Sequence, residues 1–225
     1  MAAAAAAPDT FVDSGAEEFL GEPPVLLARW RDGRRTLAKA LAGVPAGQKI
    51  PWYVTAMSPI SMATARVMET WAHGLDIADA LALTPVPTMR LRHIAHLGHR
   101  TYGHSFLVNG LPAPTTPVRL ALTAPDGTLW TFGPEDAPDR VTGPALDFCL
   151  LVTQRRHRDD VALAATGPSA RRWLDLAQAF AGLPGTGRPA SASPTSSGTG
   201  EAPHPDQNKE SPGTDQPART DEGAT

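Results

Sequence analysis

The stretch 58–83, SPISMATARVMETWAHGLDIADALAL, decides how the rest of the chain is interpreted. Ser58 is a good N-cap residue, and Pro59 suits the first turn of a helix. Apolar residues then recur at three- and four-residue spacing, which predicts a helix that ends before Thr84 and Pro85. The apolar positions share one arc of this helix, and the strongly polar positions share the roughly opposite arc.

The polar arc of this helix has two interpretations. At about 100° per residue, four side chains fall within an arc of roughly 80°: Arg66, Glu69, His73 and Asp76. The stripe is either solvent-facing, with a weak Arg66–Glu69 ion pair, or half of a metal site. The spacing of Glu69 and His73 aims a carboxylate and an imidazole at one point, as helix-borne zinc ligands require. Asp76 would orient His73, and a third ligand would still be needed.

This stretch resembles the last bundle helix of the mycothiol-dependent maleylpyruvate isomerase and DinB-like families, which are four-helix bundles that hold a divalent metal, usually zinc. Glu69 and His73 match the E-x-x-x-H ligand pair of the isomerase branch, in which a His on an earlier helix is the third ligand. Arg66 and Asp76 match polar positions that accompany the pair. The resemblance therefore implies zinc at Glu69 and His73, Asp76 behind them, and Arg66 beside a thiol cofactor such as mycothiol.

The resemblance extends to about Gly182 and is strongest to a group of actinobacterial metal-binding proteins of unknown activity. In that group the stretch 145–163, ALDFCLLVTQRRHRDDVAL, resembles a module named after wyosine base formation in tRNA. The front end differs, because relatives begin with two further helices and no His precedes His73 here. Three explanations remain open: a start downstream of the true one, two chains that complete one bundle, or a lost metal site.

The remaining elements predict an α+β fold. Residues 21–44 and 89–108 have helical spacing, although Gly98 and Gly103 weaken the second helix. The alternating segments PVRLALTA and TLWTFG are joined by Pro-Asp-Gly, which predicts a β-hairpin. The segments GPALDFCLLVTQRR and GPSARRWLDLAQAFAGL, each entered through Gly-Pro, predict two more helices.

Three parts are expected along the chain. They are a partial DinB-like helical bundle that binds the metal (1–86), a small α+β domain with the hairpin (87–182), and a disordered tail (183–225). The tail has no aromatic residue and carries the whole formal net charge of −3, so the residues before it are formally neutral. Neutrality argues against nucleic acid as a partner.

Cysteine content and hydropathy predict a soluble, cytoplasmic protein. The one cysteine, Cys149, allows no internal disulfide, and its apolar neighbours favour a buried hydrophobe over a reactive thiol. No apolar run is long enough to span a bilayer, and the Ala-rich start lacks the basic residues of a signal peptide.

Two further clusters each have a purely structural and a functional interpretation. His93, His96 and His99 fan around one helix, which favours a solvated or interdomain face unless this helix folds back to supply the third metal ligand. The run 153–160, TQRRHRDD, is either the basic end of a helix or a site for phosphate, an acidic cofactor or RNA. The single cysteine of the chain cannot hold an iron–sulfur cluster.

Three functions follow from these features. The first is a metalloenzyme in which zinc activates a small-molecule thiol for transfer to, or isomerisation of, an electrophile. The second is a non-catalytic binding protein that has lost the metal site and uses its helices to form a homodimer. The third is an accessory protein of tRNA wyosine formation that binds through 153–160.

Overall fold

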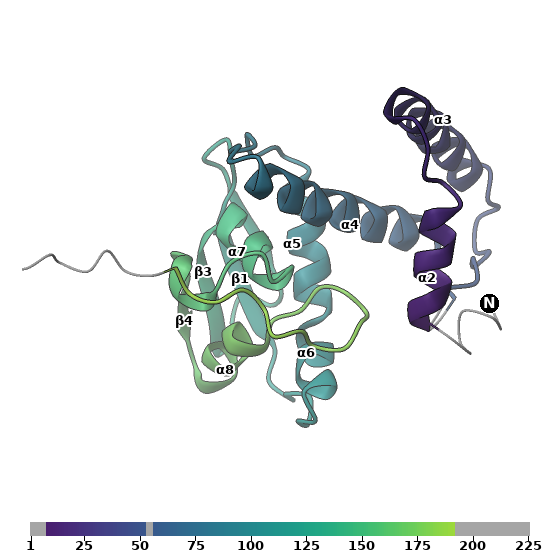
Figure 1. The fold of residues 1–225 in the computed structure, drawn as a ribbon. Coiled ribbons are helices and arrows are strands. Elements are labelled where there is room, and N and C mark those ends of the chain that lie inside the picture. The colour runs from purple at the N-terminus through teal and green to yellow at the C-terminus, as the bar shows by residue number, and fades with distance from the viewer. Residues whose placement is uncertain (1–7, 53–55, 192–225) are drawn as a thin grey trace, which may run out of the picture. The chain divides into compact units, whose positions relative to one another are not determined.

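The structure, a computed structural model, describes residues 8–52 and 56–191, and it has the α+β fold that the sequence predicts (Figure 1). The helices are α2 (Pro8–Glu17), α3 (Pro23–Ala42), α4 (Pro59–Ala80), α5 (Leu91–Arg100), α6 (Tyr102–Val108), α7 (Ala145–Val152) and α8 (Pro168–Leu176). The strands are β1 (Val118–Thr123), β2 (Leu129–Phe132), β3 (Asp139–Pro144) and β4 (Ala164–Thr166).

Helix α4 has the start, the end and the buried face that its sequence predicts. The Oγ of Ser58 accepts a hydrogen bond from the backbone N–H of Ser61 at 3.1 Å, so Ser58 is the N-cap. Met68, Ala72 and Leu75 are buried against the rest of the molecule, and α5 packs against this helix. The opposite face, which carries the polar stripe, remains partly open.

The four strands form one mixed sheet in the order β2-β1-β3-β4. The predicted hairpin is confirmed, because β1 and β2 are antiparallel with Leu122 opposite Trp130. Asp126 stabilises the turn by accepting a hydrogen bond from the backbone N–H of Thr128 at 3.0 Å. Strand β3 runs parallel to β1, and β4 runs antiparallel to β3. Neither β3 nor β4 was expected from the sequence pattern.

Two predicted helices are shorter in the structure. The Gly143-Pro144 pair ends β3 and does not open a helix, so α7 covers only Ala145–Val152. Helix α8 ends at Leu176, because the buried side chain of Gln178 donates to the carbonyl oxygens of Phe180 and Gly182 at 2.9 and 2.6 Å. These bonds hold the chain after α8 in a turn, where a continued helix would carry the same residues elsewhere.

The helix predicted over 89–108 is divided at Thr101 into α5 and α6. Gly98, expected to weaken it, is a packing position: a Cβ there would lie 2.9 Å from the Phe148 ring of α7 and 3.1 Å from Val152. The close approach of α5 and α7 therefore depends on the missing side chain.

The core lies between the sheet and helices α5, α7 and α8. Phe148, Trp173 and Tyr102 form edge-to-face ring pairs at its centre, with centroids 4.9 to 5.6 Å apart. Cys149 is fully buried, and burial raises the pKa of its thiol. The prediction of a buried cysteine is confirmed.

Helix α3 differs from the core helices because none of its side chains is buried. Its large apolar residues remain exposed: Val25, Leu26, Leu27, Trp30 and Leu37. Within the described part of the chain, α3 contacts α4 but no closed bundle covers its apolar side chains.

Candidate functional site

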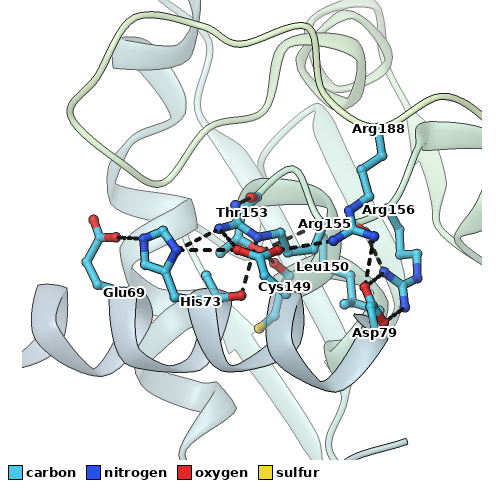
Figure 2. Close-up of polar contacts among 11 residues, drawn as sticks. Glu69, His73, Asp79, Cys149, Leu150, Thr153, Arg155, Arg156 and Arg188 are labelled. Atoms are coloured by element: carbon cyan, nitrogen blue, oxygen red, sulfur yellow. Dashed lines mark hydrogen bonds and ion pairs between the residues drawn. The ribbon is translucent and has the colours of Figure 1, made fainter. Parts of the chain in front are cut away.

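His73 lies between two carboxylates of its own helix (Figure 2). The Nε2 atom is 3.4 Å from Oε2 of Glu69, and the Nδ1 atom is 3.3 Å from Oδ2 of Asp76. This arrangement follows from helix geometry, since residues three and four apart share one face. The predicted residues Glu69, His73 and Asp76 are therefore brought together, with a different carboxylate on each ring nitrogen of His73.

Asp76 is held by arginines from two distant parts of the chain. The Nη2 of Arg155, which follows α7, donates to Oδ2 of Asp76 at 2.8 Å, and Arg188 donates to Oδ1 at 3.1 Å. Burial would raise the pKa of Asp76, but the hydrogen bond and charge of Arg155, with the bonds from Arg188 and His73, lower it. Asp76 is therefore a carboxylate at neutral pH.

Arg155 is fixed by more than this one ion pair. Its Nε donates to the carbonyl oxygen of Ala72 at 3.3 Å, and its Nη1 donates to that of Thr153 at 2.7 Å. Its Nη2 lies 3.5 Å from Nδ1 of His73, and only 17% of the side chain is exposed. This guanidinium thus connects the segment after α7 to the backbone and the polar stripe of α4.

A second ion-pair cluster lies one turn further along α4. Arg156 donates to both oxygens of Asp79 at 2.9 and 2.8 Å, and the Nη1 of Arg188 lies 2.9 Å from Oδ2. The hydrogen bonds from Arg156 lower the pKa of Asp79. Because Arg188 belongs to both clusters, it anchors the first part of the predicted tail on α4. The rest of that tail, residues 192–225, lies outside the described residues.

These contacts explain the run 153–160. Its first two arginines, Arg155 and Arg156, pair with Asp76 and Asp79. They are therefore neither the basic end of a helix nor a site open to an anion. The sequence pattern had predicted neither this pairing nor a role for Arg188. The one signal for it is a matched spacing: two carboxylates three apart on α4 and two adjacent arginines elsewhere.

A pocket of about 950 Å³ opens beside the polar stripe. Arg66, Glu69 and His73 line one wall, and most of the remaining lining is apolar. Leu97 and His104 come from α5 and α6, and Phe180 comes from the turn after α8. The stripe therefore faces a large, mainly apolar pocket, which neither interpretation of the sequence had included.

Arg66 does not pair with Glu69. No ion pair or hydrogen bond of the Arg66 guanidinium is found among the residues that the structure describes, although Glu69 is one turn away on the same face. The weak surface pair considered for these residues is thus not formed. Arg66 is exposed and lines the pocket with its charge uncompensated within the described residues.

The histidines of α5 lie elsewhere. The rings of His96 and His99 pack against Phe132 of β2 with centroids 6.1 Å apart, and Nε2 of His99 is 3.3 Å from the carbonyl oxygen of Val118. Burial lowers the pKa of His99. Helix α5 does pack on α4, but the rings of His96 and His99 pack on the hairpin, so these two histidines do not supply a third metal ligand to Glu69 and His73.

The distance between Glu69 and His73 matches the spacing of two ligands on one zinc ion. With bond lengths of about 2.0–2.2 Å and tetrahedral angles, two ligand atoms on zinc lie roughly 3.3–3.5 Å apart. The observed 3.4 Å between Oε2 of Glu69 and Nε2 of His73 agrees with that spacing. Residues 8–52 and 56–191 hold no cluster of three His, Cys, Asp or Glu side chains that would complete a site, although His104 lines the same pocket.

Comparison with known proteins identifies two segments. Residues 1–78 match the mycothiol maleylpyruvate isomerase N-terminal domain, and residues 114–166 match the wyosine base formation family. The first segment contains Glu69, His73 and Asp76, and the second contains Arg155. The ion pair between Asp76 and Arg155 therefore joins the two matched segments.

Two mycobacterial relatives cover most of the chain. They are the uncharacterized proteins MT0041 and Rv0036c of Mycobacterium tuberculosis, from strains CDC 1551 and H37Rv. Each is 53% identical over 189 residues, which is 84% of this chain and 74% of the relative. The chain belongs to their family, and its first segment relates it to the mycothiol-dependent isomerases. No solved structure matches the chain significantly. Among the described helices, none has the length and apolar character to cross a membrane.

Proposed function

We propose that the chain is a zinc-dependent enzyme of the mycothiol-related type, in which Glu69 and His73 bind the metal and a small-molecule thiol is the cofactor. The observation that carries this proposal is the geometry of His73. Its Nε2 has the ligand spacing to Glu69, while its Nδ1 faces the carboxylate of Asp76. A histidine held by a carboxylate on the nitrogen opposite the metal is the usual arrangement in zinc enzymes.

Each residue has a distinct task in this proposal. Asp76, which only accepts, keeps the ring proton of His73 on Nδ1 and leaves the lone pair of Nε2 for the metal. Arg155 fixes the position of Asp76, and Arg66 binds a polar group of the cofactor or substrate in the pocket. When bound, zinc would lower the pKa of a thiol and supply a thiolate nucleophile for transfer or isomerisation.

The thiol must come from outside the chain. Cys149 is fully buried and its thiol pKa is raised, so it is neither accessible nor a thiolate at neutral pH. A cofactor thiol, such as mycothiol, fits this arrangement and fits the match of residues 1–78.

A second copy of the chain is proposed as the source of the third ligand. Helix α3 exposes apolar side chains that a helical bundle would cover, so two chains can complete one bundle between them. A segment outside the described residues is the alternative source. Sedimentation of the full chain separates the two sources, since only the first requires a dimer.

The metal assignment is tested with a double variant. Glu69→Gln with His73→Ala removes both proposed ligands, and we expect the chain to lose tight zinc binding when measured by competition with a chromophoric chelator. The matched control is Asp159→Asn with His157→Ala, a partly exposed pair at 3.4 Å that does not line this pocket. Equal zinc binding by the two double variants would contradict the assignment.

The second candidate is a non-catalytic binding protein that has lost its metal. It is favoured by the lack of a three-ligand cluster in the described residues. If the chain is such a binding protein, the His73→Ala variant should keep its ligand binding and should still form dimers.

A role in wyosine formation has support from the match of residues 114–166. However, Arg155 and Arg156, which would contact a phosphate backbone, are already paired with Asp76 and Asp79. Salt-dependent tRNA binding that charge reversal at Arg158 abolishes would favour this role.

A further inference from the structure

The pocket beside the polar stripe carries an inference about its ligand. We infer that it binds a small molecule with an apolar, aromatic or branched aliphatic body and a single anionic end, and that Arg66 binds the anion. The inference deepens the proposed function, since this molecule would be the electrophile that the thiol attacks. The binding itself does not depend on the metal.

The size and walls of the pocket set the body of the ligand. A volume of about 950 Å³ is at the upper end of the range for small-molecule sites, roughly 300–1,000 Å³. Met68, Ile77, Leu97 and Phe180 approach it from three different parts of the fold, and Trp30 adds an indole from α3. Such walls stabilise a bulky apolar group by removing it from water.

The same walls disfavour a polyhydroxylated ligand. Hydroxyl groups placed against apolar side chains lose their hydrogen bonds to water without replacement, which weakens binding with each added group. The pocket thus fits the electrophile better than it fits a sugar-bearing thiol cofactor. The polar stripe of α4 at its edge is where the two reactants would meet.

Electrostatics set the anionic end. Two carboxylates of α4, Asp76 and Asp79, are already paired with three arginines. In the described part of the chain Arg66 has no such partner, and its charge lies beside an apolar surface, where a charge-assisted hydrogen bond is strengthened. Among the described residues that line the pocket, Glu69 is the one carboxylate, and no arginine pairs with it, so the ligand is expected to carry one negative charge and not two.

Calorimetry on the full chain, treated with EDTA, tests the inference with a matched pair of probes. The probes are 2-naphthoate and 2-naphthalenemethanol, which share an apolar body and differ in the charge of the polar end. We expect 2-naphthoate to bind more tightly, and Arg66→Met to weaken its binding about tenfold while leaving the alcohol unchanged. The control is Arg92→Met, an exposed arginine of α5 that does not line the pocket.

A second pair of variants locates the apolar contact. Ile77 and Ile60 are both exposed on α4, at 65% and 79%, and only Ile77 lines the pocket. Ile77→Asp should weaken 2-naphthoate binding at least tenfold, whereas Ile60→Asp should not change it. Because both side chains are exposed, neither change should unfold the chain.

Several results would overturn the inference. These are equal affinity for the two probes, equal losses in Ile77→Asp and Ile60→Asp, or no binding by a chain that sedimentation shows to be dimeric, in which case a second copy fills the pocket. Failure of the proposed function is a separate result. A chain that binds 2-naphthoate but no zinc keeps this inference and loses the metal assignment, and a chain that binds zinc but neither probe does the reverse.

Discussion

Arg155 shows how one residue can connect two parts of the fold. Its guanidinium reaches the carbonyl oxygen of Ala72, the carboxylate of Asp76 and the edge of the His73 ring, and it is largely buried in doing so. A residue with this many fixed contacts positions others, since three of its N–H groups already donate to Ala72, Thr153 and Asp76. Its contribution is therefore expected in the metal affinity of the site as well as in stability.

We expect Arg155→Met to lower zinc affinity by about tenfold, the lower end of the effect of residues that support metal ligands. The variant should also lower the free energy of unfolding by about 1–3 kcal/mol, because Asp76 loses a partner. Arg156→Met is the matched control: it releases Asp79, which does not contact His73. Zinc competition and urea unfolding measure the two effects, and equal zinc affinity in both variants would contradict the positioning role.

The carboxylates of α4 predict how stability changes with acid. The pKa of Asp79 is lowered from its usual 3.8 by hydrogen bonds from Arg156. A lowered folded-state pKa stabilises the fold above pH 4 and ceases to do so as the pH falls through that lowered value. In the unaltered chain the free energy of unfolding should fall as the pH drops below 4, and in Asp79→Asn it should fall less steeply. The control Asp136→Asn, at an exposed residue, should fall as steeply as the unaltered chain. Parallel slopes in all three proteins would contradict this.

At the scale of single residues, the sequence predicted the helix-borne part of the site. Glu69, His73 and Asp76 share a helix, so their proximity follows from the 3.6-residue period alone. Arg155 and Arg188 lie 79 and 112 positions away from Asp76. No local pattern encodes that distance, which only the packing of α4 on the segment after α7 determines.

Among the elements, the contact between α5 and α7 depends on a single glycine. A Cβ at position 98 would meet the Phe148 ring at 2.9 Å and Val152 at 3.1 Å, both inside a packed core. We expect Gly98→Ala to lower the free energy of unfolding by about 1–3 kcal/mol through overpacking. Gly74→Ala on α4, where nothing lies within 4 Å, should instead raise it by about 0.4–1 kcal/mol. Urea unfolding compares them, and a stabilising Gly98→Ala would contradict the packing account.

The elements that sequence patterns predicted are those with strong periodicity and clear ends. The hairpin has alternating strands and a Pro-Asp-Gly turn, and α4 has a cap and a closing proline. Strand β3 ends in Gly143-Pro144, a pair that usually marks the start of a helix or a loop, and β4 has only three residues. Strand β3 forms because β1 offers it a partner, and β4 forms because β3 does. Both pairings are tertiary contacts, which a local sequence pattern does not encode.

In the molecule as a whole, the two matched segments meet at the polar stripe of α4, through the ion pair of Asp76 and Arg155. Asp76 lies in the part that matches the isomerase domain, and Arg155 lies in the part that matches the wyosine family. Separate domains at 1–86 and 87–182 remain a proposal. The ion pairs of Asp76 with Arg155 and of Asp79 with Arg156 predict that the two parts function together and that the second supports the site of the first.

Zinc binding by the full chain tests the central claim most directly. The metal-free protein is titrated with zinc in the presence of a chromophoric chelator, and its oligomeric state is measured under the same conditions. The account predicts about one tightly bound zinc per chain, which is lost in the Glu69→Gln, His73→Ala double variant. Tight zinc binding that survives the double variant, or no tight binding by the unaltered chain in any oligomeric state, would contradict it.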